Sequence, residues 1–255
     1  MLTLSNYFFN AYLVIMNSLN RFKLPLYEQV RLQLQTALTE KKWQIDQPLP
    51  SEQELATQYK VSIGTIRKAV EKMVEAGILI KYQGKGTFLK QPDFHASLLR
   101  FFRFRDNDGV SKVPLGVVRR LEIVDGTEAI NQKLNREANK SLIFIERIRL
   151  IEDVVILSEK IWLPSDKFSK LLEVSVRDFG NLLYPFYYDK CAQFVFSATE
   201  RLEFVKGYRD KNLGNDINDN LVKVCRVANN LQGEPIEYRE SFGRADYFVY
   251  DIQIN

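Results

Sequence analysis

Apolar residues recur at helical spacing in the first third of the chain. Pro25 suits a helix start, because the first helical position needs no N–H, and the apolar positions after it predict an amphipathic helix over about 26–39. After the turn-like segment 46–50, Ser51 with Glu54 three residues on has the pattern of a capping box, which predicts a second, short helix. Ser62 is placed to cap a third helix, whose apolar stripe consists of Ile66, Ala69, Val70 and Met73 and which Gly77 ends. The last two helices, joined by a tight turn, form a helix-turn-helix.

A glycine-rich turn follows the third helix. Two strand-like runs, 78–81 and 87–90, flank the sequence Tyr82-Gln83-Gly84-Lys85-Gly86, and this predicts a β-hairpin with Lys85 at its tip. A glycine-rich turn or a capped helix pair is common by itself. Here the capped helix pair is followed by the glycine-rich hairpin within about 65 residues. This combination predicts a winged helix-turn-helix over residues 21–91, with the third helix as the recognition helix.

The remaining two-thirds of the chain has a different pattern. It contains β-branched and aromatic runs with apolar and polar residues in alternation, together with only short helical stretches, so we expect an α+β domain. The predicted strands are 143–150, 154–163, 194–197 and 222–229, and the predicted helices are 128–134, about 165–172 and about 202–207.

The charge of the chain is concentrated at one end. The 255 residues carry a net charge of +4, but residues 21–90 hold 12 Lys and Arg against 7 Asp and Glu, a net +5, and residues 91–255 hold 24 against 25, a net −1. Such asymmetry indicates a polyanionic partner for the N-terminal third, although a solvated basic face explains the charge alone equally well.

Residues 1–20 carry no charge and are rich in apolar residues. They lack a basic region and a cleavage site, and four Asn and Ser residues interrupt the apolar run, so we expect neither a secretion signal nor a membrane span. Two alternatives stay open, that Met16 is the true start or that residues 1–20 form a helix that packs on a partner. Cys191 and Cys225 lie far apart, which favours reduced thiols in a cytoplasmic protein.

The N-terminal third resembles the GntR family of bacterial regulators. The resemblance covers residues 25–90 and rests on four motifs, namely Pro25-Leu26-Tyr27, Leu49-Pro50-Ser51-Glu52 with Glu54-Leu55-Ala56, Val61-Ser62 with Thr65-Ile66-Arg67, and Gly84-Lys85-Gly86-Thr87-Phe88. It implies binding to double-stranded DNA through residues of the two helix starts and the wing, with Arg67 as the candidate for reading a guanine. The candidate contacts are Ser51, Gln53, Ser62, Ile63, Thr65, Arg67, Lys68, Gly84 and Lys85.

Two of these positions depart from the family pattern. The family commonly has Arg where this chain has Gln53 and Ile63, so the operator sequence cannot be transferred from the family. We expect Ile63 either to contact a thymine methyl group or to be neutral.

The C-terminal region resembles the UTRA effector domain of the HutC subfamily. The motifs are Arg147-x-Arg149, Glu159 with Leu163-Pro164, Leu182-Leu183-Tyr184, and Gly233-x-Pro235-Ile236-Glu237 before Arg244-x-Asp246-Tyr247. The resemblance implies an antiparallel-sheet fold like that of chorismate lyase, a homodimer that binds a palindromic operator, and control by a small effector. The expected organisation is an extension (1–20), the winged helix-turn-helix (21–91), a linker (92–97) and an effector-binding and dimerisation domain (98–255).

The candidate effector site contains several charged residues. Arg147 and Arg149 share a strand face, because side chains at i and i+2 point to the same side, and they can clamp a carboxylate or phosphate. Glu159 either orients an amine or hydroxyl of the same ligand or neutralises an arginine in an internal ion pair. Glu237 and Arg239 share another strand face with Ser241 and can complete the polar lining. Tyr184, like Tyr187 and Tyr188, is more typical of a core or a dimer surface than of a ligand site, although a ligand role stays open. The run 100–105 either roofs the pocket or is an edge strand.

The same resemblance bears on the chemistry of the effector. Family members that hold phosphosugars often have Ser where this chain has Leu182, so we expect an anionic effector that carries a carboxylate or an aromatic group instead.

An enzyme, by contrast, needs a catalytic constellation. The single histidine, His95, has no partner at metal-ligand spacing and there is no nucleophile elbow, so we expect no enzyme, no metal and no cofactor. The alternatives are a lyase-like enzyme domain fused to a DNA reader and an effector-independent DNA-binding protein. In a ligand-controlled repressor, segments 94–97 and 106–114 are candidate hinges.

Overall fold

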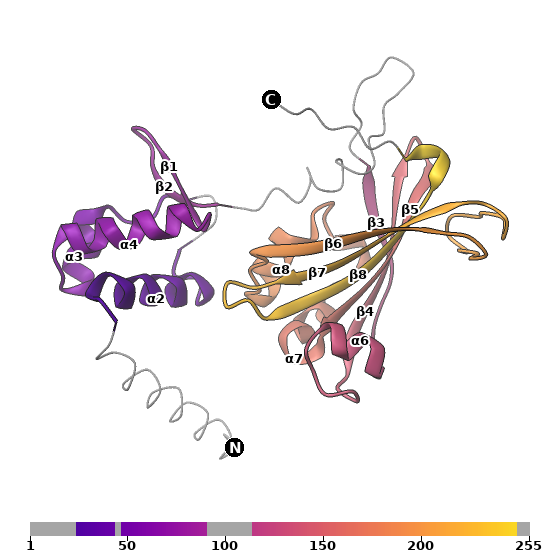
Figure 1. Ribbon diagram of the computed structural model, residues 1–255, viewed down its shortest axis with the longest axis horizontal. Coiled ribbons are helices and arrows are strands. Elements are labelled where there is room, and N and C mark those ends of the chain that lie inside the picture. Colours follow the sequence, from indigo (N-terminus) through magenta and orange to yellow (C-terminus); the bar gives the residue numbers. More distant parts are fainter. Residues whose placement is uncertain (1–23, 44–46, 91–113, 249–255) are drawn as a thin grey trace. The chain divides into compact units, whose positions relative to one another are not determined.

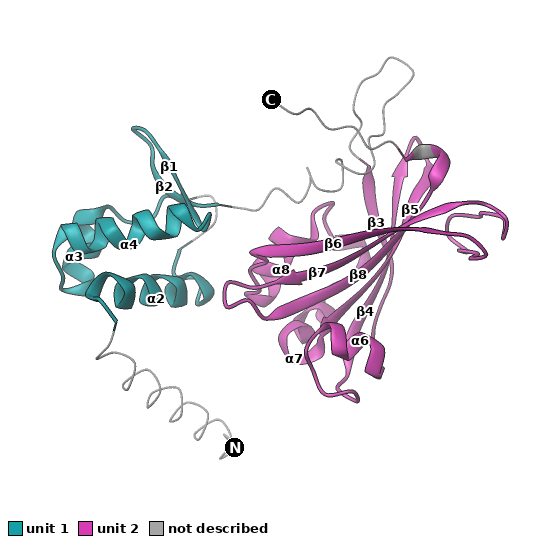
Figure 2. Ribbon diagram, in the orientation of Figure 1, with its two compact units in different colours: residues 1–91 teal, residues 92–255 magenta. Residues whose placement is uncertain are grey.

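The structure, a computed structural model, describes residues 24–43, 47–90 and 114–248 (Figure 1). The chain divides into two compact units, residues 1–91 and 92–255 (Figure 2). The extension 1–20, the linker 92–97 with His95, the run 100–105 and the hinge segments 94–97 and 106–113 lie outside the described residues.

The first unit contains three helices and a two-stranded hairpin. The helices are α2 (Leu26–Thr39), α3 (Glu52–Tyr59) and α4 (Ile63–Glu75), and the strands are β1 (Leu79–Tyr82) and β2 (Gly86–Leu89). The apolar stripes predicted from the sequence meet in one core, which includes Val30, Leu34, Leu38, Leu55, Ile66 and Met73. The winged helix-turn-helix is therefore confirmed.

Local capping determines where the helices of this unit begin and end. The Ser51 hydroxyl accepts a hydrogen bond from the Glu54 N–H at 3.3 Å, and the Glu54 carboxylate accepts one from the Ser51 N–H at 2.8 Å, which completes the capping box. Ser62 caps α4 through the Thr65 N–H at 3.2 Å. At the other end of α4, Gly77 has a φ of +73°, and N–H groups of Gly77 and Ile78 reach back to carbonyls of the last turn, each at 2.9 Å. This Schellman arrangement leads directly into the wing.

The wing is attached to the segment that precedes α3. The N–H of Leu49 donates to the carbonyl of Thr87 at 2.7 Å, and Pro48 forms a bridge with Phe88. Gly86 has a φ of +115°, and a Cβ atom there would lie 3.1 Å from that of Pro48. The hairpin is consequently held against the rest of the unit at its base.

The second unit is built on a six-stranded antiparallel sheet with the strand order β3-β4-β5-β8-β7-β6. The strands are β3 (Leu115–Val124), β4 (Leu142–Ile151), β5 (Val154–Pro164), β6 (Ser197–Val205), β7 (Leu221–Asn229) and β8 (Pro235–Arg244). The helices are α6 (Glu128–Lys133), α7 (Ser165–Phe168) and α8 (Leu183–Cys191), and the 3₁₀ turns are η1 (Ser169–Glu173), η2 (Val176–Asp178) and η3 (Ala245–Tyr247). The α+β fold class is confirmed.

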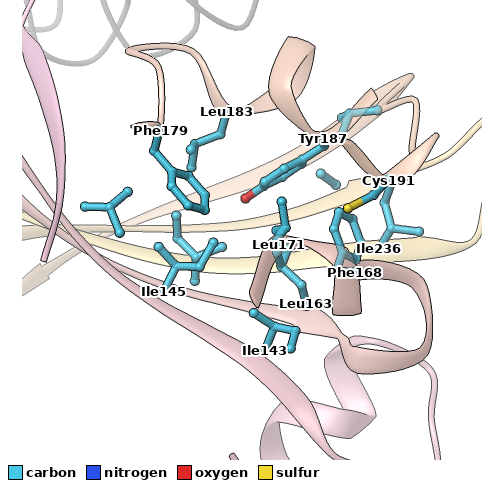
Figure 3. Close-up of a cluster of buried hydrophobic side chains, with 14 residues drawn as sticks. Ile143, Ile145, Leu163, Phe168, Leu171, Phe179, Leu183, Tyr187, Cys191 and Ile236 are labelled. Atoms are coloured by element: carbon cyan, nitrogen blue, oxygen red, sulfur yellow. The ribbon is translucent and has the colours of Figure 1, made fainter. Parts of the chain in front are cut away.

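Helices α7 and α8 and turn η1 cover one face of the sheet. Their buried side chains pack against the apolar ends of β4, β5 and β8 (Figure 3). The main members are Ile143, Ile145, Leu163, Phe168, Leu171, Leu183, Tyr187 and Ile236. This core holds α8 over a polar part of the same face, where Tyr184 and Tyr187 of the helix contact Glu237 of β8.

Several details of the second unit differ from the sequence prediction. The helix expected at about 202–207 is wrong, because residues 202–205 belong to β6, whose side chains alternate in exposure and which pairs with β7 along its whole length. The strand expected at 194–197 begins only at Ser197, and Phe194 and Val195 are buried ahead of it. The helix expected at 165–172 becomes α7 followed by η1.

Candidate functional site

The exposed side of α4 carries the predicted recognition residues. Ile66, Ala69, Val70 and Met73 are buried, which leaves Ser62, Ile63, Arg67 and Lys68 exposed and Thr65 half-buried. Ser51 and Gln53 are exposed at the start of α3, and Gly84 and Lys85 are exposed in the turn of the wing, where Gly84 has a φ of +73°.

Four of the candidate contacts line a common hollow. Gln53, Ser62, Ile63 and Thr65 surround an open depression of about 620 Å³ between α3 and the start of α4. Lys68 points elsewhere, since its Nζ lies 4.2 Å from the ring centroid of Tyr27 on α2.

Glu52 links three elements of this surface, although the sequence prediction gave it no contact of its own. Its carboxylate accepts a hydrogen bond from Arg67 Nε of α4 at 2.9 Å and from Lys81 Nζ of β1 at 3.2 Å. Burial would raise the pKa of Glu52, but the hydrogen bonds from Arg67 and Lys81 outweigh it and lower the pKa. Glu52 is therefore ionised at neutral pH.

In the second unit, the strand register brings the predicted effector residues together on the face that α8 covers. Arg147 of β4 lies opposite Glu159 of β5, which in turn lies opposite Ser241 of β8. Arg239 of β8 lies opposite Arg226 of β7. The result is a polar band across four neighbouring strands, with apolar residues on both sides of it.

Glu159 is the centre of this band. Its carboxylate accepts hydrogen bonds from Arg147 Nη1 (3.3 Å), Arg149 Nε (3.3 Å), Arg239 Nη1 (3.2 Å) and Ser241 Oγ (3.4 Å). All five residues are buried, and Glu159 and Arg147 are both 0 % exposed. Burial would raise the pKa of Glu159, but the charges of Arg149, Arg239 and Arg147 hold it well below its usual range.

A second carboxylate continues the network toward α8. Glu237 accepts hydrogen bonds from Tyr184 (2.8 Å) and Tyr187 (3.0 Å) of α8 and from two nitrogens of Arg239 (3.0 and 2.9 Å). The Tyr184 hydroxyl in turn accepts from Arg226 Nη1 at 3.0 Å, and Arg226 also pairs with Glu200. Burial raises the pKa of Tyr184 to about 12, so its hydroxyl stays protonated at neutral pH.

The network contains more positive than negative groups. Counting its members gives four guanidinium groups, from Arg147, Arg149, Arg226 and Arg239, and three carboxylates, from Glu159, Glu200 and Glu237, a net charge of +1. Burial lowers the pKa of Arg147 to about 10, which still leaves it charged at neutral pH. Within the described residues, the buried atoms Arg147 Nε and Arg149 Nη1 have no hydrogen-bond partner.

Asn181 and Gly116, a residue of the edge strand β3, also fix the position of Arg147. Its Nη2 donates to the main-chain oxygen of Asn181, whose side-chain oxygen accepts from the Gly116 N–H at 2.6 Å. A Cβ atom at Gly116 would lie 1.8 Å from Arg147 Nη2, so only glycine leaves room for the guanidinium.

The sequence prediction thus found part of the network and missed the rest. Every residue proposed for the effector site lies in it, and both interpretations of Glu159 remain open, because the internal ion pairs coexist with unsatisfied donors. Arg226 was missed although a signal existed, since it occupies the inward series Val222, Val224, Arg226 and Ala228 of a strand that was predicted. Asn181 and Gly116 carry no such signal.

Two other kinds of feature are absent from the described part of the chain. No helix there is long and apolar enough to cross a membrane. The same residues contain no group of three or more His, Cys, Asp or Glu side chains placed to hold a metal ion.

Comparison with known proteins identifies relatives of both units. Residues 26–89 match the family model described as bacterial regulatory proteins, gntR family, and residues 112–249 match that of the UTRA domain. The chain is 27% identical over 233 residues to the "Probable fructoselysine utilization operon transcriptional repressor" of Escherichia coli (strain K12), covering 89% of this chain and 93% of the relative. It is 30% identical over 159 residues to the transcriptional repressor NagR of Bacillus subtilis (strain 168), covering 62% and 65%.

A solved structure has the same fold as the second unit. The ligand-binding domain of a protein assigned to the GntR-family transcriptional regulators of Bordetella bronchiseptica superposes with a TM-score of 0.54 at 21% identity, covering 61% of this chain and 98% of that one.

Proposed function

The chain belongs to the GntR-type transcription regulators that carry a UTRA domain, and from this we propose that it is a repressor that binds a palindromic operator as a homodimer. An anionic effector that binds at the Arg147–Arg149–Glu159 network then changes the affinity for the operator. The observation that carries the proposal is the buried excess of arginine with two unsatisfied donors.

An anion at this position would provide acceptors for the two buried donors and would neutralise the net positive charge of the network. Buried polar groups without partners cost free energy, typically about 1–3 kcal/mol each and more when charged. A carboxylate that accepts from Arg147 Nε and Arg149 Nη1 would supply the missing hydrogen bonds and cancel the net charge of +1. Leu182, at the start of α8, offers no side-chain donor, and this supports the expected carboxylate or aromatic effector over a phosphosugar.

The same network supports a sensor rather than a lyase. A general acid or base works best with a pKa near the operating pH. The pKa of Glu159 is well below that range and the pKa of Tyr184, at about 12, is well above it, so neither group exchanges protons readily at neutral pH.

For the DNA, we propose that Arg67 reads a guanine, while the remaining contacts position the unit. Guanine presents two acceptors in the major groove, which match the fork of an arginine. The exposed starts of α3 and α4 and the turn of the wing supply the other predicted contacts, and Ile63, 37% exposed in the hollow, can meet a thymine methyl group. A dimer would require two half-sites at a spacing that matches the two recognition helices. Effector binding would alter that match by a coupling free energy of about 1–3 kcal/mol.

Selection of genomic fragments by the purified protein tests the DNA-binding part. We expect a palindromic site, and we expect Arg67→Ala to weaken binding to it by about 1–3 kcal/mol, most strongly at one G·C pair of each half-site. Lys72→Ala, which removes a charge from α4 next to Glu75, is the control and should retain the preference. Uniform, salt-sensitive binding without a preferred site would contradict the proposal.

Titration calorimetry tests the effector part. A panel of small carboxylates, aromatic acids and phosphates is titrated into the full chain, and operator affinity is measured again with any compound that binds. We expect Arg149→Met to abolish binding, and Arg201→Met, which changes an exposed arginine on β6, to leave it unchanged. Equal binding to both variants would place the effector elsewhere.

A further inference from the structure

Glu52 lies where a negative charge is unexpected for a DNA-binding surface. It is the first residue of α3, directly after the capping residue Ser51, and its side chain is 29% exposed. A carboxylate near DNA repels phosphates, so it should weaken binding unless it has a compensating role. The helix start favours an acidic residue, but Glu54 already provides one in the same turn.

The atoms involved indicate what that role is. Glu52 binds Arg67 through Nε, and in the described part of the chain no hydrogen bond occupies the two terminal nitrogens of Arg67. An arginine held at Nε keeps its fork of terminal nitrogens in a fixed direction, and these are the atoms that can make a bidentate contact with guanine O6 and N7. An arginine without such a support loses more rotamer freedom when it binds a base.

The second partner of Glu52 belongs to the wing. Lys81 Nζ lies 3.2 Å from the other carboxylate oxygen, so one side chain engages cations from α4 and from β1. On DNA without the operator sequence, the simplest use of both cations is to neutralise phosphates. A phosphate that approaches either cation meets the negative charge of the Glu52 carboxylate beside it, whereas the guanine edge that Arg67 reads with its terminal nitrogens is neutral and meets no such repulsion.

We propose that Glu52 is a specificity-determining residue of the DNA-binding surface, which presents the fork of Arg67 to a base and withholds Arg67 and Lys81 from phosphates on other sequences. The inference rests on the proposed function, since it assumes that α4 reads an operator. Glu52 would then increase the preference for the operator over other DNA sequences and would not increase the affinity for DNA in general.

The test compares Glu52→Ala and Glu52→Gln with Glu75→Ala in the full-length chain. Glu75 is the matched control, because it is a carboxylate of this unit that likewise forms an ion pair, 2.6 Å from Lys72 near the end of α4. Affinity is measured over a salt series for the selected operator duplex and for a random-sequence duplex of the same length, and melting temperatures verify folding.

We expect Glu52→Ala to bind random DNA more tightly and to discriminate the operator roughly tenfold less well, which is within the worth of one bidentate contact. The dependence of log K on log salt for random DNA should steepen by roughly one to two, because two released cations each displace counterions. Glu52→Gln, which retains an acceptor without the charge, should show the same change in salt dependence with a smaller loss of discrimination.

The outcomes separate this inference from the proposed function. If a palindromic operator is found and Arg67→Ala loses it, but both Glu52 variants behave like Glu75→Ala, the role of Glu52 is wrong and the proposed function stands. If Glu52→Ala weakens binding to both duplexes equally, Glu52 only stabilises the fold and the inference is again wrong. If no operator exists for the unmodified chain, both fail.

Discussion

Replacing Gly116 on β3 with alanine should disrupt the buried arginine–glutamate network, because the new methyl group would collide with Arg147 on the neighbouring strand β4. The new Cβ would lie 1.8 Å from Nη2, 2.4 Å from Cζ and 2.7 Å from Nε of Arg147. Ordinary contact begins at 3.4 Å, so the guanidinium must move by roughly 1.6 Å, the difference between 3.4 and 1.8 Å. Arg147 is 0% exposed and cannot turn into solvent.

The movement would break the bonds of Arg147 to Glu159 and to Asn181. Disrupting a buried ion pair so that a charge is left without its partner costs about 3–5 kcal/mol. We therefore expect the second unit of Gly116→Ala to unfold at a urea concentration roughly 2 M lower than that of the unmodified chain. The variant should also lose affinity for any effector that the calorimetric panel identifies.

The fluorescence of Trp162, in a Trp43→Phe background, reports the unfolding of the second unit alone, because these are the two tryptophans of the chain. Gly180→Ala is the matched control, since a Cβ there meets nothing within 4 Å and the φ is not in the left-handed region. Its stability should change by less than about 0.5 kcal/mol. Similar midpoints for the two variants would refute the close approach of Arg147 to Gly116.

Two further predictions concern the same unit. Acid should remove the stabilisation that Glu159 provides: its folded pKa is lowered, so the contribution is present above the unfolded pKa, near 4.5, and is lost as the pH falls through the folded value. The stability difference between the unmodified chain and Glu159→Gln should therefore shrink below about pH 4.5, and a constant difference down to pH 2 would show that Glu159 has no such role. Leu182→Ser should supply the missing cap of α8, stabilise the unit by about 0.5–2 kcal/mol and raise its affinity for inorganic phosphate, with Leu182→Ala as the control. A gain in stability without a gain in phosphate affinity would exclude the start of α8 from the anion site.

The first unit could be predicted almost completely from the sequence because its signals are local. A helix-starting proline, a capping serine, an apolar stripe and a terminal glycine each act within a few residues. Helix α2 begins after Pro25, α3 and α4 begin after capping serines, and α4 ends just before Gly77. The contact between Glu52 and Lys81 joins residues 29 positions apart, so no local pattern indicates it.

In the second unit, the sequence predicts which side chains share a strand face, because side chains along a strand point alternately to its two sides. Arg147, Arg149 and Glu159 share a face because of the two-residue period of a strand, and a short turn joins the two strands. Helix α8 was not predicted, because its aromatic residues and Pro185 have low helix propensity and packing on the sheet stabilises it instead. Pro185 lies in the first turn, where no intrahelical N–H is lost.

The attachment of the wing to the segment before α3 also has an evolutionary consequence. Hydrogen bonds at Leu49 and Gly77 and the bridge between Pro48 and Phe88 close the first unit on itself, so its reading surface is determined by residues 24–90. Such a unit can be joined by recombination to an unrelated sensor without losing the sequence that it recognises. A chimaera of residues 1–91 with an unrelated ligand-binding domain that is dimeric should therefore keep the DNA sequence preference of the parent and respond to the ligand of the donor.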